Sequence, residues 1–191
     1  MPRSSETDVL VTVRDLVRWG ASRFREAGLH FGHGTDNALD EAFHLVLHAL
    51  HLTADVPAIY LEANVTARER AAALKLLRAR VTTRKPAAYL LGRIEFCGLE
   101  FEIDENVLIP RSPIGEMIER RFAPWLQDEP ARVLDLCTGS GCIGIACAAA
   151  FGDAQVDLAD LSPKALAVAR RNVARHAMGN QVRVIKSDVF D

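Results

Sequence analysis

The sequence predicts an α/β protein in which a small helical domain precedes a parallel sheet. Amphipathic helical patterns fill the first 85 residues, an alternating pattern typical of a hairpin follows, and short apolar runs then alternate with helical stretches. This last order, β-α-β-α-β, is typical of one half of a doubly wound parallel sheet. We therefore predict a helical domain over residues 1–85, a β-hairpin linker over 86–112 and a partial sheet domain over 113–191.

Capping residues and apolar stripes predict three helices in the first domain. Thr12 and Thr66 are each followed three residues later by an acid, which is the spacing of a capping box at the start of a helix. An apolar stripe over residues 38–50 predicts another helix, which begins near Thr35 or Asp36. Three amphipathic helices can bury one small shared core.

A change of period after Pro86 predicts the hairpin. Apolar residues alternate with acids over residues 94–104, and Cys97-Gly98 between the two runs suits a tight turn. A helix then follows, with Ser112 as its cap and Pro113 in its first turn.

The partial sheet domain has the clearest pattern. A short buried strand, a glycine-containing turn and a helix of small residues follow one another, and the strand-helix order then repeats. The predicted strands are 132–136, 155–159 and 182–185, and the predicted helices are 142–150 and a second one that begins at Pro163 behind a Ser162 cap.

Composition and charge exclude several classes of protein and of binding site. The net charge of -2 gives no global attraction to nucleic acid, and no apolar run approaches the roughly 18 residues that span a bilayer. The four cysteines form neither a Cys-x-x-Cys pair nor a zinc spacing, so we predict no metal site. Cys137, Cys142 and Cys147 are expected to be buried as small reduced hydrophobes, and the predicted location is cytoplasmic.

The segment Asp135–Gly141 is the candidate ligand-binding turn. Gly139 and Gly141 allow a sharp turn and a close approach of a ligand, while the following helix presents unpaired amides and a partial positive charge. Together with Gly144, these glycines satisfy G-x-G-x-x-G, and Asp160 follows at about the sequence spacing expected for an acid that binds a ribose. An NAD or FAD site and a purely structural turn are therefore alternatives.

Asp135 favours a cationic ligand over a dinucleotide. A carboxylate beside the turn would repel a pyrophosphate, whereas S-adenosylmethionine carries an ammonium and a sulfonium. Asp160 can accept the ribose hydroxyls, and Asp188 with Val189 can contact the adenine. The predicted cofactor-binding residues are Asp135, Thr138, Gly139, Ser140, Gly141, Asp160, Leu161, Asp188 and Val189.

The motifs around this turn resemble a known family. Residues 134–143, with Val-Leu-Ile-Pro-Arg at 107–111, resemble the protein-glutamine N5-methyltransferases related to HemK. Residues 31–42, which include His33, and Ile109–Ile114 resemble the branch that methylates a glutamine of a large-subunit ribosomal protein. The resemblance implies a Rossmann-like class I methyltransferase domain, S-adenosylmethionine as cofactor and a helical substrate-recognition domain. Arg111 and Glu116 are expected to border the cofactor or glutamine pocket, and a cap at the hairpin-to-helix junction is the alternative for Arg111.

The sequence departs from this family at its catalytic motif. Family members carry Asn-Pro-Pro-Tyr after the fourth strand, and no Asn-Pro pair occurs here, so no catalytic residue is predicted in this chain. Three of an expected seven strands are present. We therefore expect a truncated, inactive chain whose first strand could self-associate through its uncovered edge. A non-catalytic donor-binding module is the alternative.

A basic run over residues 68–85 is a candidate RNA contact. Seven lysines and arginines stand against the single acid Glu69, and Arg68, Lys75 and Arg78 share one helical face. Such a face could bind a ribosomal precursor that carries RNA, although a charge run is more often a solvated surface.

Overall fold

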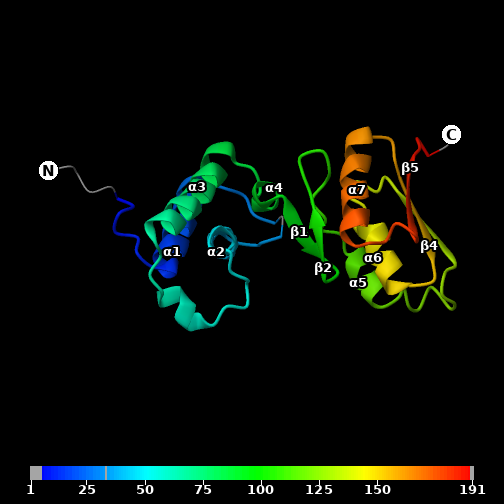
Figure 1. Cartoon of the computed structure of the whole chain (residues 1–191), viewed down its shortest axis with the longest axis horizontal. Helices are drawn as coiled ribbons and strands as arrows, with labels where there is room; N and C mark the ends of the chain where they lie inside the picture. Colours follow the sequence, from blue (N-terminus) through cyan, green and yellow to red (C-terminus); the bar gives the residue numbers. More distant parts are fainter. Residues whose placement is uncertain (1–5, 33, 190–191) are drawn as a thin grey trace. The chain divides into compact units, whose positions relative to one another are not determined.

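A computed structural model describes residues 6–32 and 34–189, so His33, which belongs to the resemblance segment 31–42, lies outside the described residues. Contacts divide the chain into two units, Met1–Leu91 and Gly92–Asp191 (Figure 1). The division falls inside the predicted linker segment 86–112.

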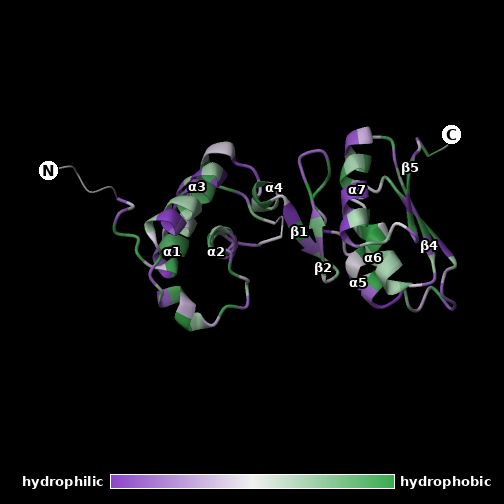
Figure 2. Cartoon of the chain, viewed as in Figure 1, coloured by the Kyte–Doolittle hydropathy of each residue, from purple (hydrophilic) through white to green (hydrophobic). Residues whose placement is uncertain are grey.

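Three helices form the core of the first unit: α1 (Val13–Glu26), α2 (Ala38–Ala49) and α3 (Ala67–Thr83). The capping boxes predicted at Thr12 and Thr66 are both present. Apolar residues recur along all three helices (Figure 2), and their buried members form one cluster. The start predicted for α2 is slightly early, because Asn37 is the cap and its side chain accepts the amides of Leu39 and Asp40.

Two short helices of this unit were not predicted from the sequence. The 3-10 helix η1 spans Ala58–Glu62 and α4 spans Ala87–Leu91. Each has five residues, which is too short for a helical period to show in the sequence. No described helix of the chain is both long and apolar enough to cross a membrane.

The second unit begins with the predicted hairpin. Strands β1 (Arg93–Phe96) and β2 (Leu99–Glu102) pair antiparallel, and the turn residues Cys97 and Gly98 both have positive φ. Helix α5 follows at Ile114–Glu119. Its start corrects the prediction: Pro113 is the cap residue rather than part of the first turn, and the Ser112 hydroxyl accepts the Ile114 amide at 3.2 Å.

The predicted half-sheet is present. Strands β3 (Arg132–Leu136), β4 (Gln155–Asp160) and β5 (Val182–Lys186) are parallel in the order β3-β4-β5. Helices α6 (Cys142–Ala150) and α7 (Pro163–Arg175) lie on one side of the strands in Figure 1 and share a buried cluster with them. The register pairs Leu136 with Ala159 and Ala159 with Ile185, so the carboxyl ends of all three strands lie at one edge.

The cysteine prediction is right for two residues and wrong for one. Cys142 and Cys147 are buried on α6, and burial raises the pKa of each thiol to about 11. Cys137 is exposed. It follows the last residue of β3, has a φ of 57° and lies in the turn before α6, whereas the other two lie on α6 itself.

Candidate functional site

The turn between β3 and α6 requires its glycines. Gly139 and Gly141 have φ values of 57° and 82°, which L side chains rarely adopt. A Cβ on Gly141 would lie 3.0 Å from Cδ1 of Leu158, and one on Gly144 would lie 2.1 Å from Cδ2 of that residue. The glycines therefore have two roles: they form the turn, and they let α6 pack directly on β4.

Asp135 lies beneath this turn. It is the penultimate residue of β3, it is buried, and its Oδ2 accepts the Thr138 hydroxyl at 2.6 Å and the Gly144 amide at 2.9 Å. Burial raises the pKa of Asp135, the two hydrogen bonds oppose that shift, and the negative charge of Asp160 adds to it. The carboxylate thus joins the end of the strand to the first turn of α6.

Asp160 binds the turn from the neighbouring strand. At the end of β4, its Oδ2 accepts the Gly139 amide at 3.0 Å and its Oδ1 accepts the Ser162 amide at 2.9 Å. A carboxylate has about four lone-pair sites. Capacity to accept hydroxyl groups of a ligand therefore remains after both backbone bonds are made.

The other predicted cofactor residues lie along the same edge of the sheet. Leu161 is 61% exposed directly after β4, and Val189 is 46% exposed after β5. Asp188 is exposed next to Val189. The amide of Ser187 donates to the carbonyl of Asp160 at 3.2 Å, so the segments that follow β4 and β5 leave the sheet side by side. Hydrogen bonds thus bring together Asp135, Thr138, Gly139 and Asp160, with Asp188 and Val189 beyond the neighbouring strand.

A cavity of about 320 Å³ opens beside the turn. Arg111 lines it, as do Thr138, Gly139 and Ser140. Glu116, the other predicted border residue, is exposed on α5 and is not among the lining residues. Sequence analysis did not predict most of the other residues that line the cavity, because an apolar side chain does not indicate a particular chemistry. These other lining residues include Phe96, Leu108, Ile109, Pro110, Cys137, Cys142 and Ile143.

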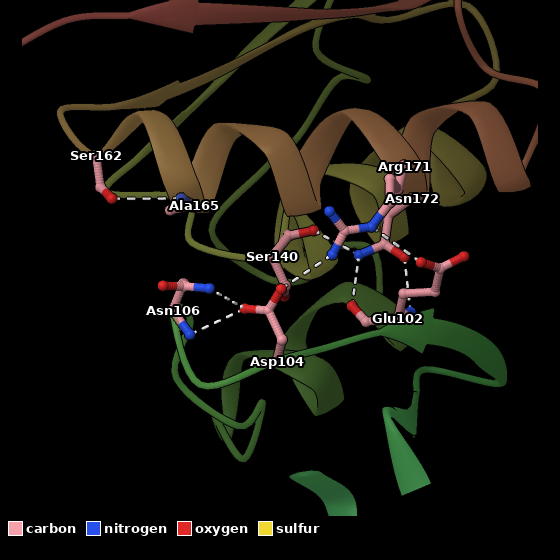
Figure 3. Close-up of polar contacts among 8 residues, drawn as sticks. All are labelled: Glu102, Asp104, Asn106, Ser140, Ser162, Ala165, Arg171 and Asn172. Atoms are coloured by element: carbon pink, nitrogen blue, oxygen red, sulfur yellow. Dashed lines mark hydrogen bonds and ion pairs between the residues drawn. The ribbon is translucent and has the colours of Figure 1, made fainter.

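Sequence analysis also missed Asn172. This residue is fully buried on α7, and its side chain contacts the backbone of Ser140 in the turn (Figure 3). One feature of the sequence could have identified Asn172: its side-chain amide lies next to Val173, on the face of α7 where the apolar stripe predicts burial. A buried amide has to make hydrogen bonds, so a polar residue in such a stripe indicates a specific partner.

Comparisons with known proteins agree with the motifs. A family model described as "Methyltransferase small domain" matches residues 120–191. The ribosomal protein uL3 glutamine methyltransferase of Francisella tularensis is 45% identical over 184 residues, which are 95% of this chain and 59% of that protein. A Xylella fastidiosa protein of the same name is 52% identical over 96% of this chain and 59% of its own length.

Among solved structures, the N-terminal domain of human METTL16 in complex with SAH has a TM-score of 0.42 and 17% identity, over 79% of this chain and 56% of that one. The chain spans about three-fifths of the length of the curated relatives it matches. Across nearly all of its own residues, the chain is similar in sequence to these uL3 glutamine methyltransferases.

Proposed function

We propose that this chain supplies the S-adenosylmethionine-binding part of an enzyme that methylates a glutamine side chain, at N5, in ribosomal protein uL3. The names of its curated relatives support the reaction and the substrate. The turn supports the cofactor, because two carboxylates, Asp135 and Asp160, bond directly to its backbone and side chains. A ribosomal substrate also supports a cytoplasmic location.

The charge of the turn is the observation that carries the cofactor assignment. Burial raises the pKa of Asp135 and the negative charge of Asp160 adds to that shift, so two acids already share this small region. A pyrophosphate would add like charge to a partly desolvated site, whereas the ammonium and sulfonium of S-adenosylmethionine would offset it. This balance favours the methyl donor over NAD or FAD.

The proposed roles follow the positions of the residues. Asp135 provides negative charge beneath the methionine end, Asp160 accepts the ribose hydroxyls, and Asp188 with Val189 contacts the adenine. The cavity beside Arg111 would admit the acceptor glutamine. An amide nitrogen is a poor nucleophile, so the reaction depends on aligning it with the sulfonium methyl group. The sequence has no Asn-Pro pair, and we assign the aligning step to no residue of this chain.

Calorimetric titration tests the cofactor proposal. We expect the chain to bind S-adenosylmethionine and Asp135→Ala to abolish that binding. Asp157→Asn is the matched control, because Asp157 is an acid of β4 that bonds to Arg183 and Arg132 rather than to the turn. Tight binding of NADH in place of the methyl donor would favour the dinucleotide alternative.

A transfer assay tests the activity of the chain itself. We expect no methylation when the chain is incubated with labelled donor and uL3, while the Xylella fastidiosa relative methylates uL3 under the same conditions. Turnover by the chain would refute this part of the proposal.

We also propose an RNA contact on α3 of the first unit. Arg70 donates to the carbonyl of Asp8, Arg80 pairs with Glu41, and Arg84 donates to two carbonyls at the end of α1. By contrast, Arg68, Lys75 and Arg78 are exposed, and no hydrogen bond or ion pair to another described residue engages their side chains. Their shared face is available for phosphates.

Salt dependence tests this contact. We expect the chain to bind assembling large ribosomal subunits with an affinity that falls as salt rises, and Lys75→Glu with Arg78→Glu to remove most of it. Arg14→Glu is a control that reverses one charge at an exposed ion pair on α1. Equal binding by both variants would contradict an RNA contact on α3.

Self-association through β3 is a further part of the proposal. Among the described strands β3 pairs with β4 alone, and its Leu134 and Leu136 are 59% and 46% exposed. An apolar strand with a free edge can pair with a second copy. Sedimentation over a range of concentrations would detect such dimers, and Leu134→Lys should weaken them.

A further inference from the structure

Three consecutive residues of the candidate donor turn are each held by a side chain from a different element. The Thr138 hydroxyl donates to Asp135 of β3, and the Gly139 amide donates to Asp160 of β4. The carbonyl of Ser140 accepts the side-chain amide of Asn172, from α7, at 2.8 Å. The first two side chains belong to the predicted cofactor site, and the third does not.

Asn172 makes three hydrogen bonds inside the protein. Its Nδ2 donates to the carbonyls of Ser140 and of Glu102, the latter at 2.9 Å, and its Oδ1 accepts the Glu102 amide at 2.7 Å. Figure 3 shows the side chain between the turn and the end of β2. Two carbonyls and one amide fix the orientation of the side chain, since a flipped amide would place like groups together at each contact.

The position of Asn172 makes it a physical link between two segments that line the cavity. On one side it holds Ser140, a lining residue. On the other it pairs with the backbone at the end of β2, from which the chain runs through Asp104 to the lining residues 108–112. Within the described part of the chain, the side chain of neighbouring Arg171 bonds to the side chains of Glu102 and Asp104, so of these two α7 residues it is Asn172 that reaches the turn.

We infer that Asn172 is a positioning residue of the donor site. It fixes the Ser140 carbonyl and so holds the turn in place relative to residues 108–112, which follow the hairpin and line the cavity. This inference rests on the proposed donor site. Preformed geometry reduces the ordering cost of binding, so the loss of this link should weaken donor binding beyond any loss of global stability.

The chain offers a matched control in Gln181. Its Nε2 also donates to two carbonyls, those of Ala148 and Phe151, at 3.0 and 3.1 Å. These carbonyls lie at the far end of α6 from the turn. Gln181→Glu therefore removes a side-chain NH₂ group, as Asn172→Asp does. It does so at a place that leaves the S-adenosylmethionine site unchanged.

The experiment compares Asn172→Asp, Asn172→Ser and Gln181→Glu with the unchanged chain. Amide hydrogen exchange at Gly139 and Gly141 reports the order of the turn, titration with S-adenosylmethionine reports donor binding, and urea unfolding reports stability. Asn172→Ser is the less severe change, because it places no buried charge beside two carbonyls, and it provides the test if Asn172→Asp does not fold.

We expect exchange at these glycines to rise, and donor affinity to fall, by about tenfold in the Asn172 variants, as the loss of one buried hydrogen bond predicts. Gln181→Glu should lower stability and leave both readouts unchanged. The inference is overturned if the Asn172 variants lose stability alone. If the unchanged chain binds no donor, the proposed function fails, and exchange at Gly139 and Gly141 still decides whether Asn172 orders the turn.

Discussion

The carboxylate of Asp160 accepts the backbone amide of Gly139 at 3.0 Å, so the acid at the end of β4 holds the turn that follows β3. Its second oxygen accepts the amide of Ser162, the cap of α7. One side chain therefore fixes two neighbouring strand ends relative to each other. A ligand at this edge would meet a turn that is already ordered, which lowers the entropy lost on binding.

Replacement of Asp160 by asparagine should loosen this edge. The single carbonyl oxygen of the new side chain can accept one of the two amides, and its NH₂ group faces the other donor. We expect Asp160→Asn to lower the free energy of unfolding by about 1–3 kcal/mol, as for an unsatisfied buried donor. Urea denaturation measures this change. Asp157→Asn removes an acid from exposed ion pairs on the same strand, so a loss as large as that of Asp160→Asn would contradict the explanation.

Gly144→Ala should destabilise the second unit by overpacking. The new methyl group would lie 2.1 Å from Cδ2 of Leu158 and 3.1 Å from Cβ of Asp135, so the buried Leu158 side chain or α6 would have to shift. Such strain costs roughly 1–3 kcal/mol. Thermal and urea unfolding would measure it. Gly152→Ala is the control, because a Cβ there meets nothing within 4 Å, and its stability should stay within about 0.5 kcal/mol of the unchanged chain.

Glu41→Gln should destabilise the helical unit far more than a comparable surface change. Glu41 and Arg80 form a buried ion pair, and Glu41 also accepts the Thr35 hydroxyl. Removal of one partner leaves a buried charge without compensation, which costs about 3–5 kcal/mol. Glu62→Gln breaks the exposed pair with Arg14 and should cost less than about 1 kcal/mol. Similar unfolding midpoints for the two variants would show that the buried pair contributes little.

Asp135 and Asp157 should give pH dependences of opposite sign. Burial raises the pKa of Asp135 in the folded chain, so its contribution to stability is fully present below the ordinary aspartate pKa of about 3.9 and is lost as pH rises through the folded value. Asp135→Asn should therefore gain stability, relative to the unchanged chain, as pH rises through this range.

The hydrogen bond from Arg183 lowers the pKa of Asp157, so that contribution is present above about pH 3.9 and is lost as pH falls through the folded value. Asp157→Asn should lose stability, relative to the unchanged chain, as pH rises through the corresponding range. Urea unfolding of both variants from pH 3 to pH 7 gives the two slopes. Slopes of the same sign would contradict the assignment.

Sequence analysis predicted the elements that rest on local rules. The capping boxes at Thr12 and Thr66, the turn at Cys97-Gly98 and the Ser162 cap are confirmed, because each depends on residues close together in the chain. The parallel strands are confirmed because strands separated by amphipathic helices admit few topologies. The burial predicted for residues 132–136 is wrong, because Leu134 and Leu136 of β3 are exposed. Helices η1 and α4 were missed because five residues are too few for a period.

The sequence by itself determined the α/β order of elements, the glycine turn and the acids at the ends of the strands, because these follow from residue type and spacing. The tertiary structure alone decided what those acids contact, that Cys137 is exposed, and that Asn172 bonds to Ser140 across 32 positions of the chain. Partners so distant in sequence meet only when β2, α6 and α7 pack together. No local sequence pattern predicts which backbone carbonyl a buried side-chain amide will bond to.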